Sequence, residues 1–231
     1  MKKNLAIVAE YNTESETHIA TIKAIEHSKT FLNIDLNASW ISTEDITEKL
    51  LKQFQGLWIG TGSPYKNMAN ALFALEYSRK KNIPTFGTCG GFQHMMLEYV
   101  RNVLGFSDAE HAEYDPYASK IFISELECSL RGREMELKLT PNSRVANFYG
   151  KTIVKEKYYC NFGINPEYVD LIRNGPFHIV GSDSEGEIRI IENPDHNFFI
   201  GTLFVPQVMS TEKNPHPLVT GFINSIFSDK T

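Results

Sequence analysis

The chain has 231 residues, of which 42% are hydrophobic and 22% charged, a composition typical of a globular protein that needs no disulfide or metal to fold. Its net charge of −5 comes without any basic run, which argues against a nucleic-acid partner, and no apolar stretch approaches the roughly 20 residues of a membrane span. Three widely spaced cysteines and the lack of a signal-peptide pattern favour the cytoplasm over a secreted disulfide framework.

Strand-like and helix-like patterns alternate through the first half of the chain. Short apolar runs predict four buried strands, each followed by apolar residues at helical spacing. The strands are expected at Leu5–Ala9, Ile34–Trp40, Gly56–Gly60 and Ile83–Gly87, and the helices around Ile19–Ile25 and over Thr43–Leu51, Ala69–Lys80 and Phe92–Val103. This alternation predicts an α/β fold, in which a mostly parallel sheet carries helices on both faces.

The second half is richer in strand patterns. These patterns cover Ile121–Ser124, Glu134–Leu139, Thr152–Tyr159, Phe177–Gly181, Glu187–Ile191 and Phe198–Leu203, and a final helix is expected at about Leu218–Phe227. No repeat, low-complexity tract or flexible linker divides the chain. Residues 1–231 are therefore expected to form a single domain.

The segment from Phe86 to Gln93 carries the most specific signal. A strand here must turn abruptly into a helix, and glycines flank Cys89, a single nucleophilic side chain. This is the arrangement of a nucleophile elbow, in which the N–H of Gly90 points to where an oxyanion forms and the helix N-terminus favours the thiolate. A buried structural cysteine is the alternative. We expect Cys89 to be a reactive thiol.

The sequence Gly87-Thr88-Cys89-Gly90-Gly91-Phe92-Gln93 resembles the G-x-C-x-G-x-Q elbow of the class I glutamine amidotransferases. Further segments resemble the glutaminase domain of CTP synthase: Ala74–Arg79, Glu98–Gly105, Ala112–Pro116 and Ile190–Gly201. The resemblance covers nearly the whole chain and implies a flavodoxin-like α/β sandwich. The amide-forming domain that precedes the glutaminase domain in CTP synthase has no counterpart in this sequence, so the chain by itself is not expected to make CTP.

The triad of the family is altered in this sequence. In the family, a His and a Glu from an H-P-E motif assist the nucleophile, but the matching residues here are Val205, Pro206 and Gln207. A valine cannot transfer a proton, which argues against ordinary glutaminase chemistry. An arginine that holds the substrate carboxylate in the family corresponds to Tyr159.

Other parts of the family's site persist. The loop Gly60–Pro64 resembles the oxyanion-forming loop, and Gly62 within it could supply a backbone N–H. Gln93 lies one helical turn after the nucleophile and on the same side of the helix. Glu113 matches the acid that contacts the amino group of the substrate in the family. The expected ligand is therefore a small, amine-bearing molecule related to an amino acid.

Two residues could stand in for the missing base. His111 lies two residues before Glu113, and an exposed loop histidine is the alternative. Glu10 ends the first predicted strand, and in the superfamily typified by DJ-1 a strand-end glutamate sits beside the elbow thiol. A solvated strand-end acid is the alternative for Glu10. His94 is expected to be a packed helix residue, and His216 lies too far along the chain to replace the base.

The remaining cysteines, Cys128 and Cys160, fall among strand patterns and are expected to be buried, so Cys89 is predicted to be the most reactive thiol. No Cys or His spacing predicts a zinc site, and neither a metal nor a cofactor is expected. Pairing of either cysteine with Cys89 stays open.

Three functions fit these observations. The first is a Cys89-dependent hydrolase or transferase acting on a small amide or related carbon–nitrogen group, with a partner synthase or ligase acting in trans left open. The second is a binding or regulatory module that kept the pocket and lost the chemistry, as Val205 and Gln207 indicate. The third is a thiol protein of the DJ-1 type, in which Glu10 would sit beside Cys89.

Overall fold

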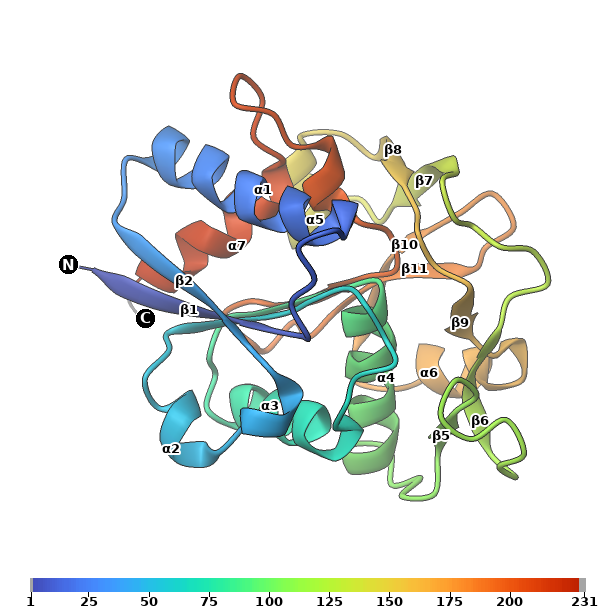
Figure 1. The fold of residues 1–231 in the computed structure, drawn as a ribbon. Helices are drawn as coiled ribbons and strands as arrows, with labels where there is room; N and C mark the ends of the chain where they lie inside the picture. The colour runs from blue at the N-terminus through green and yellow to red at the C-terminus, as the bar shows by residue number, and fades with distance from the viewer. Residues whose placement is uncertain (1, 229–231) are drawn as a thin grey trace.

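The computed structural model describes residues 2–228 and is built around a nine-stranded sheet (Figure 1). The strands are β1 (Lys3–Val8), β2 (Leu36–Ile41), β3 (Gly56–Ile59), β4 (Thr85–Thr88), β7 (Glu134–Leu139), β8 (Ile153–Lys157), β10 (His178–Ser182), β11 (Ile188–Glu192) and β12 (Phe199–Thr202). Their order is β2-β1-β3-β4-β12-β11-β10-β7-β8. The first five strands in this order run parallel, and the last four pairings are antiparallel. The expected α/β fold is confirmed.

Helices cover both faces of this sheet. They are α1 (Glu16–Leu32), α2 (Glu48–Leu51), α3 (Met68–Lys80), α4 (Gly90–Asn102), α5 (Arg144–Tyr149), α6 (Val169–Arg173) and α7 (Pro217–Phe227). Figure 1 shows α1 and α7 packed together on one side of the parallel strands and α3 and α4 on the other. None of the helices within residues 2–228 combines the length and the apolar character that crossing a membrane requires.

The helix expected over Thr43–Leu51 is wrong in its extent. A short 3₁₀ turn covers Thr43–Asp45, and the α-helix covers only Glu48–Leu51. Two caps cause the break, because the side chains of Ser42 and Thr47 each accept a backbone N–H and begin a separate helical segment.

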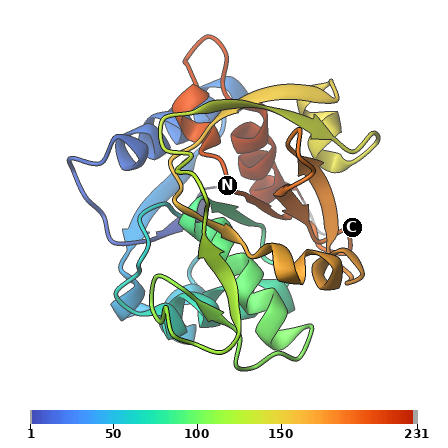
Figure 2. The ribbon, with the colours of Figure 1, turned by 90° about the vertical axis from the view of Figure 1, so that its right-hand side faces the viewer.

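A small second sheet lies beside the carboxyl-terminal half of the main one. It consists of β5 (Glu110–His111), β6 (Ile121–Glu125) and β9 (Phe162–Ile164), and this side of the molecule faces the viewer in Figure 2. The sequence patterns predicted β6 but neither β5 nor β9, because strands of two or three residues are too short to show a period. The short helices α5 and α6 were missed for the same reason.

The core beneath the parallel strands is aromatic. Trp58 on β3 and Phe86 on β4 lie in register and contact each other, with ring centroids 5.2 Å apart. Phe222 of α7 packs against both rings. Every residue of β3 and β4 is buried, as expected for strands covered on both faces. This packing fixes β4, whose carboxyl end carries the elbow.

Candidate functional site

The turn from β4 to α4 is a strained elbow with Cys89 at its apex. Cys89 has φ 53° and ψ −110°, a conformation that non-glycine residues rarely adopt. The glycines on either side permit close packing of the helix on the sheet. A Cβ on Gly91 would collide with the carbonyl of Ile59 on β3, and one on Gly87 would collide with the sulfur of Met95. The predicted nucleophile elbow therefore has the expected geometry.

The predicted oxyanion loop lies against this turn. A Cβ built on Gly90 would be 3.2 Å from the backbone nitrogen of Ser63, so the two amides are neighbours. The Gly90 N–H belongs to the first turn of α4, where no helical carbonyl accepts it. Gly62 has φ 101°, which requires glycine. The His18 ring packs against Gly62 and hydrogen-bonds to the carbonyl of Thr61 at 3.1 Å, which holds the loop in place.

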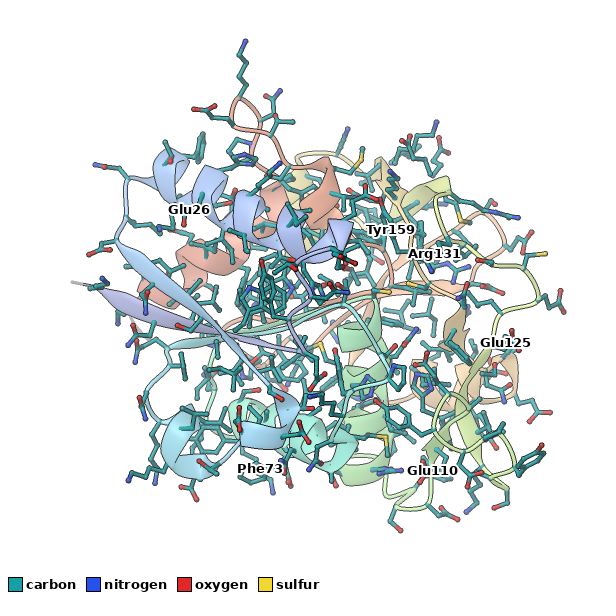
Figure 3. The ribbon with its side chains drawn as sticks, viewed as in Figure 1. Glu26, Phe73, Glu110, Glu125, Arg131 and Tyr159 are labelled. Carbon is teal, nitrogen blue, oxygen red and sulfur yellow. The ribbon has the colours of Figure 1, made fainter. Side chains whose placement is uncertain are left out.

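A cavity of about 560 Å³ opens at the elbow. Its walls come from the start of α1, the oxyanion loop, the start of α4, the loop after β5 and the segment between β8 and β9. Among its lining residues are Glu16, Gly62, Ser63, Cys89, Gln93, Glu113, Arg131, Tyr159 and Cys160. Figure 3 labels Tyr159 and Arg131, which both line the cavity. Cys89, Gln93 and Glu113 thus share one cavity, as their sequence positions predicted.

His111 is buried and is used to orient Gln93. Its Nδ1 accepts the N–H of Glu113 at 3.1 Å, so Nε2 carries the proton and donates to Oε1 of Gln93 at 3.1 Å. Gln93 in turn donates from Nε2 to the carbonyl of Phe162 at 2.8 Å. Burial lowers the pKa of His111 to about 3, which keeps the ring neutral. With both ring nitrogens engaged, His111 has no nitrogen left for Cys89, and it is not the exposed loop residue of the alternative reading.

Glu113 carries an unsatisfied carboxylate oxygen. Within residues 2–228, its Oε2 is buried and has no hydrogen-bond partner. Burial raises the pKa of Glu113, and a hydrogen bond from Ser63 acts in the opposite direction. A buried acceptor without a partner is costly, so a ligand that donates from an ammonium or amide group would be bound favourably here.

Tyr159 closes part of the cavity rim. Its hydroxyl donates to Oε1 of Glu16, the first residue of α1, at 2.8 Å, and Lys157 lies 5.3 Å from the centre of its ring. Burial raises the pKa of the Tyr159 phenol. The residue joins the segment after β8 to α1. The cation on this rim is Arg131, which the sequence reasoning did not identify.

Glu10 lies outside the lining of this cavity. Its carboxylate accepts hydrogen bonds from the backbone N–H of Thr43 at 3.0 Å and from the Thr43 hydroxyl. It therefore caps the 3₁₀ turn after β2. A role for Glu10 beside Cys89 stays a prediction that this placement does not support.

Val205 and Gln207 lie at the end of the strand next to the elbow. Val205 is fully buried. The Gln207 amide donates from Nε2 to the hydroxyls of Thr21 and Thr88, at 3.1 and 3.4 Å. Neither side chain lines the elbow cavity. Gln207 thus supports the residue that precedes Cys89 instead of orienting a base.

A second thiol lies beside the elbow. The Sγ atoms of Cys89 and Cys160 are 2.9 Å apart, and Cys160 Sγ donates to the carbonyl of Leu203 at 2.8 Å. Cys160 is buried, as expected. The expectation that Cys128 is buried is wrong, because it lies exposed in the turn between β6 and β7. The ranking of Cys89 as the most reactive thiol loses that support, since Cys128 is open to any reagent.

Two other histidines belong to buried networks. His94 bridges the carbonyl of Gly90 and the hydroxyl of Tyr114, and burial lowers its pKa to about 4. His216, although distant along the sequence, pairs with the buried carboxylate of Glu156 at 3.0 Å. Within residues 2–228, no group of three or more His, Cys, Asp or Glu side chains is arranged to bind a metal.

Comparisons with known proteins agree with this geometry. The family model Glutamine amidotransferase class-I matches residues 16–225. CTP synthase of Thermococcus gammatolerans is 28% identical over 235 residues, 96% of this chain and 44% of that protein. CTP synthase of Onion yellows phytoplasma is 31% identical over 233 residues, 96% of this chain and 43% of that protein. The chain spans less than half the length of these relatives.

A solved structure has the same fold. The glutaminase domain of Trypanosoma brucei CTPS with bound acivicin matches with a TM-score of 0.89 at 23% identity, over 99% of this chain and 96% of that chain. The family match covers most of the sequence, from residue 16 to residue 225, and it includes the elbow. The chain therefore belongs to the class I glutamine amidotransferase family.

Proposed function

We propose that the chain is a Cys89-dependent hydrolase or transferase that acts on the carbon–nitrogen bond of a small, amine-bearing amide. The observation that carries this proposal is the shared cavity, which is lined both by a nucleophile on a strained elbow and by Glu113, whose buried carboxylate has one oxygen without a partner within residues 2–228. The strain at Cys89 favours a functional role, because unfavourable backbone conformations persist where the surrounding structure maintains them.

The chemistry follows from the groups around the elbow. The Cys89 thiolate attacks the carbonyl carbon of the amide, and the oxyanion that forms accepts the N–H of Gly90 and that of the oxyanion loop at Ser63. The carbon–nitrogen bond breaks, the amine leaves with a proton, and a thioester remains on Cys89. Water releases the acid in a hydrolase, and an acceptor nucleophile takes the acyl group in a transferase.

Proton transfer is the weak part of this site. Within residues 2–228, the hydrogen-bond partner of Cys89 Sγ is the Cys160 thiol, and no histidine bonds to it. Burial and the neighbouring Cys89 sulfur raise the pKa of Cys160 well above its usual range, so Cys160 stays a neutral thiol, which donates its proton to the carbonyl of Leu203 and cannot act as a base for Cys89. The leaving amine then takes its proton from cavity water, which makes hydrolysis slow.

Glu113 and Arg131 define the ligand in this proposal. The Glu113 carboxylate anchors the amino group, and Arg131, which lines the same cavity, attracts a carboxylate or another acceptor. The curated relatives are CTP synthases. The same proposal therefore includes a separate synthase or ligase, acting in trans, that receives the ammonia.

A second candidate function is a binding or regulatory module without turnover. The burial of Val205 and the hydrogen bonds of the Gln207 amide favour it, since neither side chain can transfer a proton to the elbow. Ligand binding without product formation would distinguish this module from an enzyme.

The test combines binding with turnover. The full chain is incubated with a panel of amino-acid amides and nitriles and with acivicin, the compound bound in the Trypanosoma brucei structure. Thermal shift reports binding, and ammonia release reports hydrolysis. The enzyme hypothesis predicts that one ligand stabilises the wild type and releases ammonia, that Glu113→Gln loses the stabilisation, and that Cys89→Ala keeps it without releasing ammonia. Binding with no ammonia would favour the module, and equal stabilisation of Glu113→Gln would exclude the anchor.

A further inference from the structure

Two free thiols meet at the elbow although 71 residues separate them in the sequence. The 2.9 Å between Sγ of Cys89 and Sγ of Cys160 places the sulfurs in direct contact. This separation exceeds the length of a disulfide bond, about 2.05 Å, by less than 1 Å. The structure thus places a second sulfur where only the nucleophile was predicted.

Backbone hydrogen bonds hold both residues in this arrangement. The N–H of Cys89 donates to the carbonyl of Thr202 at 2.9 Å, and the carbonyl of Cys160 accepts the N–H of Leu130 at 3.1 Å. The Cys160 thiol also donates to the carbonyl of Leu203. Because the main chain of each cysteine is hydrogen-bonded, the contact between the sulfurs is preorganised.

The two thiols differ in access. Cys89 is 8% exposed and Cys160 only 2% exposed, although both line the elbow cavity. Cys89 thus offers more surface than Cys160 to a molecule in the cavity. This is the asymmetry expected of an attacking thiol and a resolving thiol.

We propose that Cys89 and Cys160 form a dithiol–disulfide pair that exchanges with small disulfides entering the elbow cavity. The Cys89 thiolate attacks one sulfur of the small disulfide, whose second sulfur leaves as a thiolate. That small thiolate takes the proton of Cys160, and the Cys160 thiolate then attacks Cys89 Sγ, which releases the second small thiol. The cysteine pair loses two electrons, and the small disulfide gains them and becomes two thiols. An external dithiol reverses the reaction.

This inference does not depend on the proposed amide chemistry, and it adds a condition to it. The oxidised pair holds no thiolate, so the elbow cannot attack a carbonyl until a reductant restores it. Cys89 would therefore be a nucleophile under reducing conditions and unreactive towards carbonyl groups under oxidising conditions.

The experiment measures thiols and not turnover. The reduced full chain is treated with 2-hydroxyethyl disulfide, a small neutral probe, then blocked with N-ethylmaleimide and analysed by intact mass and peptide mapping. The Cys128→Ser chain serves as the parent, because Cys128 is exposed and would react on its own. We expect the parent to lose two hydrogens in mass, with residues 89 and 160 cross-linked and no probe attached.

Two further variants identify the roles of the sulfurs. Adding Cys160→Ser removes the resolving thiol, so the mixed disulfide at Cys89 should rise about ten-fold or more over the parent, because an intramolecular thiol outcompetes any thiol in solution. Adding Cys89→Ser should leave Cys160 unmodified. A parent chain that accumulates the mixed disulfide, or stays reduced under a large excess of probe, would overturn the proposal. Circular dichroism of each variant confirms folding, and the parent result alone tests the pair if a variant misfolds.

Discussion

The close approach of α4 to β3 at Gly91 permits a quantitative prediction. In Gly91→Ala the new methyl group would overlap the carbonyl of Ile59, which is backbone and cannot rotate away. We expect the start of α4 to move outward, which loosens the contacts of the fully buried side chains Phe92 and Met95. A buried side chain makes about 50 contacts of about 0.1 kcal/mol each, and a gap of 0.5–1 Å loses a quarter to a half of that energy.

Two such side chains together lose about 3 kcal/mol, and the helix preference of alanine over glycine recovers at most about 1 kcal/mol. The net destabilisation of Gly91→Ala is therefore about 2 kcal/mol. With a urea dependence of about 3 kcal/mol per molar, the unfolding midpoint should fall by about 0.7 M. Fluorescence of the buried Trp58 during urea titration measures this midpoint.

Gly90→Ala is the matched control, one residue earlier in the same helix turn. Its methyl group would lie 3.1 Å from the side chain of Ser63 and 3.2 Å from the backbone nitrogen of the same residue, so a movement of this loop by a few tenths of an ångström relieves the contact. We expect its cost to stay below about 0.5 kcal/mol. If Gly91→Ala unfolds at the same urea concentration as the wild type, or if both variants lose the same stability, the reasoning from close packing is refuted.

Proton transfer and buried titratable groups give three further predictions. Glutamine hydrolysis should be about 10²–10⁴-fold slower than with an intact base, because Val205 transfers no proton; ammonia release at an ordinary enzymatic rate would contradict this. Burial lowers the pKa of His94 to about 4 and of His111 to about 3. As the pH falls below about 6.5, these two rings are therefore protonated in the unfolded chain while they remain neutral in the folded chain. The free energy of unfolding, measured in urea titrations, should be unaffected by these rings above that pH and should fall towards pH 4. His111→Gln should make this fall less steep. If the pH dependence of His111→Gln equals that of the wild type, the lowered pKa of His111 is contradicted. Burial raises the pKa of Glu113, so calorimetric affinity for an amine ligand should weaken as the pH drops through that raised pKa, and Glu113→Gln should lose this pH dependence.

Local signals in the sequence predicted the scaffold of the site well. The alternating patterns of the first half correspond to β1–β4 and to the long helices α1 and α3, whereas they did not predict the break that limits α2 to Glu48–Leu51. The glycines around Cys89 predicted the elbow, because only a sharp strand-to-helix turn needs small residues on both sides of a polar one. Spacing alone also placed Gln93 on the cavity side of α4.

Contacts between distant segments were beyond the reach of such signals. Cys160 reaches the elbow through a turn between β8 and β9 that carries no period of its own, so nothing in the sequence paired it with Cys89. His111 became an orienting residue because the two-residue strand β5 buries it. Cys128 is exposed because it lies in the turn between β6 and β7, whereas the expectation that it is buried came from its place in the strand-rich half of the sequence.

The end of β12 has a mechanical consequence for the two sulfurs. Consecutive carbonyls, those of Thr202 and Leu203, hold the elbow amide of Cys89 and the thiol of Cys160. A breathing motion of the sheet that displaces this strand end displaces both cysteines in the same direction. Their separation is thus shielded from fluctuations that widen or narrow the cavity around them. The cavity mouth can open to admit a ligand while the spacing of its reactive centre stays constant.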